Sequence, residues 1–163
     1  MRLASVLLVF LVASAQPAHG QQGIFLLRHA ERVEYESPDG VLSQAGEARA
    51  QLLARLLKDA GVTSIYTTDR KRTIQTAEPL AKALGISPVV VGSAESVAAT
   101  LDQVRTRDKS GVVVIVAHSN TVPAFLKALG HSGEIKIGDR EHDDLFVIVP
   151  NASGPPTVLR VNY

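Results

Sequence analysis

The stretch GVVVIVAHSN, residues 111–120, decides the fold, because it joins the most apolar run after the N-terminal segment to an abrupt polar ending. The six apolar residues Val112–Ala117 are typical of a strand buried on both faces of a parallel sheet. His118-Ser119-Asn120 follows at once, at the carboxyl end of that strand, where open α/β sheets bind their ligands. The sequence therefore predicts a central parallel strand with a site at its end.

Short apolar runs and helical periods alternate on both sides of this strand. Further strands are predicted at Ile24–Leu27, Ser64–Thr67, Val89–Val91, Leu145–Val149 and Thr157–Val161. Helices are predicted from the N-cap Ser43 to Gly61, from Arg70 to Leu84 with a kink or break at Pro79, from Val97 to Val104, and from Pro123 to Gly130. This alternation favours a three-layer α/β sandwich with a mostly parallel central sheet and helices on both faces.

Length and composition indicate one domain that needs neither disulfides nor metals for its core. The chain has 163 residues, of which 45% are hydrophobic and 20% charged, with a net charge of +1. This balance gives no whole-chain signal for nucleic acid or an anionic membrane surface. Because the chain has no Cys, thiol catalysis and Cys-ligated metals are excluded.

The N-terminus resembles a secretory signal peptide. Arg2 precedes the apolar run Leu3–Ala15, which is too short to cross a bilayer comfortably as a helix, and small residues follow it. We expect residues 1–20 to be a cleaved signal peptide and residues 21–163 to form the domain. The expected location is periplasmic or extracellular, with no membrane contact after cleavage.

Two more polar clusters follow predicted strands. Arg28-His29 comes after the first strand, and Thr67–Arg72 includes the end of the second. Together with His118 they bring two imidazoles and several cations to one edge of the sheet. Guanidinium groups match phosphate oxygens bidentately, and a neutral imidazole can act as a covalent nucleophile. The three clusters therefore favour phosphoryl chemistry.

At these residues the chain resembles the histidine phosphatase superfamily, also called phosphoglycerate-mutase-like, and within it a small exported phosphatase branch. The family's Arg-His-Gly corresponds to Arg28-His29-Ala30, and its Ser-x-x-x-Arg-x-x-Gln-Thr-Ala to Thr68–Ala77. Its strand ending in His-Gly or His-Ser corresponds to Val116–Ser119. Its Leu-Thr-x-x-Gly helix start corresponds to Leu42–Gly46. The three main motifs occur in family order and spacing over roughly residues 23 to 149.

The resemblance implies a role for each matched residue. His29 would become the phosphohistidine, and Arg28 and Arg72 would clamp the phosphate. His118 would donate to the transferring oxygens, and Ser119 and Asn120 would contact the substrate. The implied activity is hydrolysis of a small or protein-borne phosphate ester, with no metal and no cofactor. The sequence carries no signal for an oligomeric state.

Two departures from the family pattern bear on this site. Ala30 replaces Gly and would be strained by about 1 kcal/mol or more if its φ were positive. The general acid, which the family usually places after the third strand, corresponds to Glu95. The rival acids are Asp143, Asp144 and Glu31, and the further alternative is that no residue serves as a dedicated acid, as in some small family members.

Other functions are weaker alternatives. A phosphoglycerate-mutase-type phosphotransferase needs lids and insertions for which the chain has little room. A second alternative is a catalytically weak module that binds phosphate or a phosphosugar, and its only support is Ala30 and the undecided general acid. A metallohydrolase would use residues without a tight ligand spacing: His118, His131, His142, Asp143 and Asp144. A serine hydrolase through Ser119 lacks the Gly-x-Ser-x-Gly elbow. Residues 31–39, with Tyr35, and 131–144 are expected to line the outer pocket.

Overall fold

The computed structural model describes residues 21–33, 39–92, 96–151 and 153–163. The predicted signal peptide, Tyr35 and Glu95 lie outside this part of the chain. The strands are β1 Gln21–Arg28, β2 Val62–Thr68, β3 Val89–Val91, β4 Gly111–Ala117, β5 Asp144–Val149 and β6 Thr157–Asn162. The helices are α1 Gln44–Leu57, α2 Lys71–Leu84, α3 Val97–Arg107 and α4 Thr121–Ala128.

The six strands form one sheet in the order β3-β2-β4-β1-β5-β6. The strands from β3 to β1 are parallel, while β5 and β6 form an antiparallel hairpin at the other edge. The apolar strand β4 lies between β2 and β1, so its residues are covered on both sides and both faces, as its composition predicts. The predicted α/β class with a mostly parallel sheet is confirmed.

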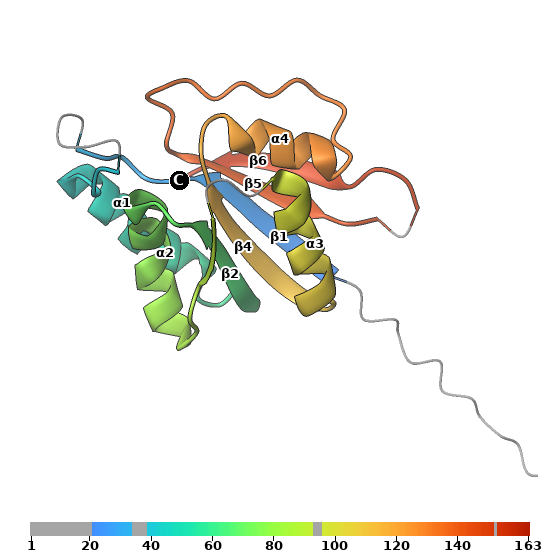
Figure 1. The fold of residues 1–163 in the computed structure, drawn as a ribbon, viewed down its shortest axis with the longest axis horizontal. Coiled ribbons are helices and arrows are strands. Elements are labelled where there is room, and N and C mark those ends of the chain that lie inside the picture. The colour runs from blue at the N-terminus through green and yellow to red at the C-terminus, as the bar shows by residue number, and fades with distance from the viewer. Residues whose placement is uncertain (1–20, 34–38, 93–95, 152) are drawn as a thin grey trace, which may run out of the picture.

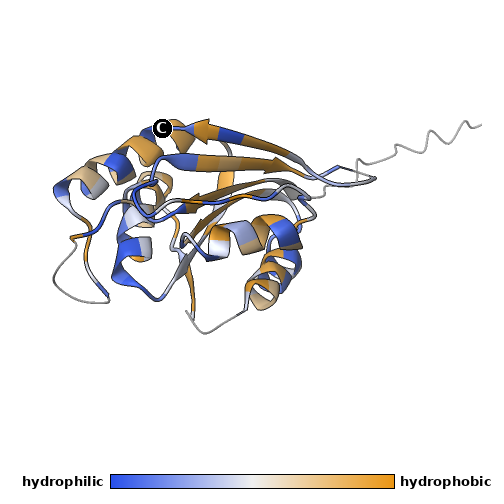
Figure 2. Ribbon diagram, turned by 90° about the horizontal axis from the view of Figure 1, so that it is seen from above, coloured by the Kyte–Doolittle hydropathy of each residue, from blue (hydrophilic) through white to orange (hydrophobic). Residues whose placement is uncertain are grey.

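Helices cover the sheet in two pairs, α1 with α2 on one face and α3 with α4 on the other (Figure 1). The first pair buries residues such as Leu53 and Leu80 against Ile65 and Val114. The second pair buries residues such as Leu101 and Phe125 in the opposite core. Figure 2 shows the hydrophobic colour concentrated along the strands, whereas the helices carry both colours, as expected for amphipathic helices on a buried sheet.

Pro79 does not break α2, which runs without interruption from Lys71 to Leu84. The neighbouring Ala77, Leu80 and Ala81 are buried against the sheet, and this packing outweighs the one backbone hydrogen bond that the proline removes. No helix in the described ranges is both long and apolar enough to cross a membrane.

The carboxyl ends of β1, β2 and β4 meet at one edge. Arg28, the last residue of β1, pairs with Ala117, the last residue of β4. Thr68 ends β2, the strand on the other side of β4. The three polar clusters predicted from the sequence therefore meet where β4 ends.

Candidate active site

His29 lies just beyond β1, with only 4% of its surface exposed. Its backbone N–H donates to the carbonyl of Ala117 at 3.0 Å. Its Nδ1 is 2.8 Å from the carbonyl oxygen of Ala30, which can only accept, so Nδ1 carries the proton. Burial, together with the positive charge of Arg72, lowers the pKa of His29 to about 3. A neutral ring protonated at Nδ1 has its free electron pair on Nε2.

Ala30 stands beside His29 without strain. The described residues include no non-glycine residue with positive φ, so the expected conflict at this position does not arise. The methyl group is fully buried against Leu42 and Ala50. The N–H of Ala30 donates to Thr76 Oγ1 at 3.0 Å, and that hydroxyl donates to the carbonyl of Arg72 at 2.6 Å. Thr76, in the Gln-Thr-Ala part of the motif, thus ties the segment after β1 to α2.

Arg28 connects β1 to the segment that follows α4. Its Nη1 donates to the carbonyls of Gly138, at 2.8 Å, and Glu141, at 3.1 Å. Its Nε is buried and has no hydrogen-bond partner among the described residues. Since a buried donor without a partner is unfavourable, the geometry suits an anion that accepts from the remaining edge of this guanidinium.

His118 is held at the end of β4 from two sides. Its Nε2 is 3.1 Å from Thr68 Oγ1, and its Nδ1 is 3.4 Å from Arg72 Nη2. Burial and the charges of Arg72 and Arg70 lower its pKa to about 4, so this imidazole is also neutral at pH 7. The ring centroids of His29 and His118 are 5.4 Å apart in an edge-on arrangement. The two predicted histidines therefore face one space.

That space is a cleft of about 430 Å³. Its described lining consists of Arg28, His29, Arg32, Arg70, Arg72, His118, Ser119, Asn120 and Asp139. All the predicted site residues that the structure describes therefore line one cleft. Glu95, the expected general acid, lies outside the described residues. Cations predominate on the wall, which suits an anionic ligand.

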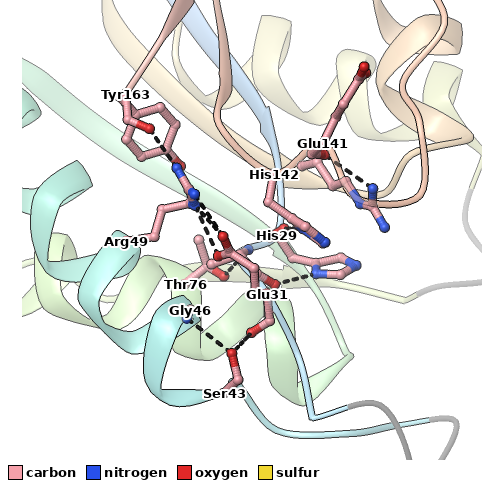
Figure 3. A network of polar contacts seen from close by, with 11 residues as sticks. His29, Glu31, Ser43, Gly46, Arg49, Thr76, Glu141, His142 and Tyr163 are labelled. Carbon is pink, nitrogen blue, oxygen red and sulfur yellow. Dashed lines mark hydrogen bonds and ion pairs between the residues drawn. The ribbon is translucent and has the colours of Figure 1, made fainter.

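None of the rival acids lines the cleft. Glu31 accepts three hydrogen bonds from Arg49 at 2.7–3.0 Å (Figure 3). Burial opposes the ionisation of Glu31, but these bonds outweigh it and lower its pKa below the ordinary value. Asp144 is buried and accepts from Arg160 Nε and Nη2, both at 2.6 Å. Asp143 does not line the cleft.

No three His, Asp or Glu side chains in the described ranges gather closely enough to hold a metal ion. Of the residues proposed for a metallohydrolase, His142 has another contact. Its Nδ1 donates to the carbonyl oxygen of His29 at 2.9 Å, and the two rings lie 5.6 Å apart (Figure 3).

Sequence reasoning missed Asp139 and considered His142 only as a metal ligand. Asp139 is the one carboxylate on the described cleft wall, and His142 holds the main chain of His29. Both belong to residues 131–144, which were expected to line the outer pocket. No local pattern marks either residue, because contacts with Arg28 and His29, more than 100 residues away in sequence, place this segment.

Comparison with known proteins gives partial matches in sequence and near-complete matches in fold. A family model described as "Histidine phosphatase superfamily (branch 1)" matches residues 24–94. A "Probable phosphoglycerate mutase GpmB" of Yersinia enterocolitica is 39% identical over 72 residues, and one of Photorhabdus laumondii is 38% identical over 69 residues. These alignments cover 40% and 38% of this chain but only 34% and 32% of the relatives, so the chain spans about a third of their length.

Two solved structures extend the likeness to most of the chain. The protein histidine phosphatase SixA, solved with tungstate, superposes with a TM-score of 0.69 at 17% identity, covering 86% of this chain and 96% of SixA. A mycobacterial glucosyl-3-phosphoglycerate phosphatase superposes with a TM-score of 0.65 at 16% identity, covering 87% and 98%. At such identities the likeness concerns the fold. Together, the family model, the sequence relatives and this fold support the resemblance of the chain to the histidine phosphatase superfamily, with the sequence match confined to residues 24–94 for the family model.

Proposed function

We propose that the protein is a phosphohydrolase that removes the phosphoryl group of a phosphomonoester through a phosphohistidine on His29. The observation that carries this proposal is the state of His29, whose neutral ring is fixed with the proton on Nδ1 and the free electron pair on Nε2. A neutral nucleophile is required because an imidazolium has no electron pair to offer phosphorus.

In the first step, Nε2 of His29 bonds to phosphorus as the bond to the leaving oxygen breaks, and that oxygen takes up a proton. Arg28 and Arg72 balance the charge on the three equatorial oxygens. Arg72 Nη2 can only donate to Nδ1 of His118, so the neutral ring carries its proton on Nε2, which donates to Thr68 Oγ1. His118 thereby orients the guanidinium of Arg72, which binds the phosphoryl oxygens.

In the second step, water attacks phosphorus, the bond to Nε2 breaks, and inorganic phosphate is released. Asp139, the carboxylate on the described cleft wall, can take the proton of the attacking water. Glu95 is the proton donor expected from the sequence for the first step. Replacing each acid by its amide would assign these two roles.

The test is release of inorganic phosphate from p-nitrophenyl phosphate by the purified protein, with His29→Ala as control. We expect turnover together with an acid-labile, alkali-stable phosphoryl label on the wild type and neither on His29→Ala. Turnover that persists in His29→Ala would overturn the covalent mechanism. Binding of inorganic phosphate by a wild type that shows neither the label nor phosphate release would favour a binding module.

The matches to GpmB sequences give a specific reason to test a second candidate, a mutase-type phosphotransferase. The protein is incubated with 3-phosphoglycerate, and both the isomerised ester and free phosphate are quantified. We expect phosphate release to dominate, since a mutase must keep water from its phosphohistidine while the substrate reorients. Isomerisation with little phosphate release would reverse the assignment.

We also propose that the protein is exported after cleavage of residues 1–20. The support is the charge and hydropathy pattern of that segment. N-terminal sequencing of the protein from a periplasmic or culture fraction tests this, and a mature chain that begins at Met1 would contradict it.

A further inference from the structure

A second basin, of about 330 Å³, adjoins the cleft that is lined by His29 and His118. The residues that line this basin are Arg28, Glu31, Arg32, Asp139, Arg140 and His142. Arg28, Arg32 and Asp139 line both spaces, so the two adjoin along a shared wall. This shared wall places the basin beside any group that is bound in the cleft.

The basin is cationic. Its lining holds three arginines against Asp139 and Glu31. Glu31 is bound by Arg49, which is not part of the lining, so its charge is already balanced. With Arg49 counted, four arginines stand against two carboxylates, which gives a net formal charge of +2 in and beside the basin. An anion that enters the basin gains from this charge.

The turn that carries Arg140 has a fixed backbone. The N–H of Glu141 donates to the carbonyl of Gly138 at 3.0 Å, and the N–H of Gly138 donates to Glu141 Oε2 at 2.9 Å. Asp139 and Arg140 form the tip of this turn. The carbonyls of Gly138 and Glu141 are the two that Arg28 binds, so the turn is fastened to the guanidinium expected to clamp the phosphoryl group.

Phosphoryl binding does not account for Arg140, because this residue lines the basin and not the cleft. We propose that the basin binds a second anionic group of the substrate, a carboxylate or a second phosphate, through Arg32 and Arg140. Guanidinium groups suit both anions, because their paired N–H donors match two oxygens at once. This inference rests on the proposed function and narrows the substrate class to small phosphomonoesters with a further anion on a short linker.

The test uses two matched substrate series, ω-carboxyalkyl phosphates and ω-hydroxyalkyl phosphates with two to five carbons. An alkane bisphosphate series separates a carboxylate from a second phosphate. At the best chain length we expect kcat/KM to be about tenfold higher for the anionic member, the size of a charge-assisted hydrogen bond. Arg32→Gln and Arg140→Gln should each bring this ratio close to one.

Arg55→Gln is the matched control, since it removes the same charge from an exposed position of α1 outside the cleft and the basin. It should leave the ratio unchanged. A wild-type ratio near one at every length, or a ratio that both basin variants leave intact, would overturn the inference.

A binding measurement distinguishes failure of this inference from failure of the proposed function. Calorimetry on His29→Ala measures the affinity for the same substrates without turnover. If the wild type hydrolyses none of the esters but His29→Ala binds the anionic series about tenfold more tightly, the proposed function fails and the basin assignment stands. If the wild type hydrolyses both series without any preference, the basin assignment fails and the proposed function stands.

Discussion

Gly46→Ala should destabilise the protein, although alanine is the better helix former. Gly46 lies in the first turn of α1, where Ser43 Oγ accepts from its N–H at 3.2 Å (Figure 3). A Cβ at this position would lie 2.1 Å from the carbonyl oxygen of Glu31 and 3.0 Å from its carbonyl carbon. Normal contact requires α1 or the strand end to move by about 1 Å.

The magnitude follows from two opposing effects. In an unhindered helix interior, Gly→Ala stabilises by about 1 kcal/mol. Overpacking against rigid backbone costs about 1–3 kcal/mol, and a carbonyl cannot move aside as a flexible side chain can. The rigid carbonyl places the cost at the upper end of that range, about 2–3 kcal/mol, so we expect a net loss of about 1–2 kcal/mol, which lowers the unfolding midpoint by about 2–8 °C. Because Glu31 is two residues from His29, kcat/KM should also fall by about tenfold or more.

Thermal unfolding and phosphatase kinetics on the same preparation measure both effects. Ala48→Gly is the matched control, because Ala48 is exposed on the same helix and reports helix propensity alone. It should cost about 1 kcal/mol and leave kcat/KM unchanged. A midpoint raised by Gly46→Ala would refute the argument that this contact controls the position of α1.

Three further predictions concern ionisable groups. Asp144→Asn should lower the free energy of unfolding by about 2 kcal/mol, because the charge pairing between the buried carboxylate and Arg160 is lost. The kcat/KM for any phosphate ester should stay within about threefold of the wild-type value. A large loss of kcat in the folded variant would restore Asp144 as a candidate general acid. His142→Leu should lower kcat by about tenfold with little change in KM, because the carbonyl of His29 loses its hydrogen-bond donor. His142→Asn should recover most of this loss, because its amide can donate to the same carbonyl. Equal kcat values for the two variants would contradict this prediction. Stability should fall as the pH drops from about 6.5 towards 4, because the folded chain lowers the pKa of His29 to about 3 and that of His118 to about 4, so the unfolded chain binds more protons in that range. A plot of the unfolding midpoint against pH should have a smaller slope for His118→Asn than for the wild type. An unchanged slope would contradict the lowered pKa of His118.

The alternation of strands and helices, with polar clusters at three strand ends, is written in short segments of the sequence. Runs such as Val112–Ala117 predict a buried strand from local composition, and parallel strands align their carboxyl ends. The convergence of Arg28, His29, Arg72 and His118 on one cleft was therefore predictable. So was the N-cap Ser43, because capping depends on neighbours three residues away.

Long-range contacts decided which acids face the cleft. Glu31, the acid nearest to His29 in sequence, is held by Arg49, and Asp144 is held by Arg160, whereas Asp139 is placed on the cleft wall. Such contacts also allow α2 to continue through Pro79, because burial against the sheet outweighs a local propensity.

Local sequence patterns were sufficient for the fold class and for the pair of histidines, since both follow from signals that extend over a few residues. The surroundings of the histidines became visible only in three dimensions: an unstrained Ala30, a helix start at Gly46 pressed against Glu31, and the turn 138–141 fastened to Arg28. These features depend on contacts between segments 15 to more than 100 residues apart in the chain. Nothing in the local sequence of either segment specifies such a contact, because it forms only when the whole sheet brings the two segments together.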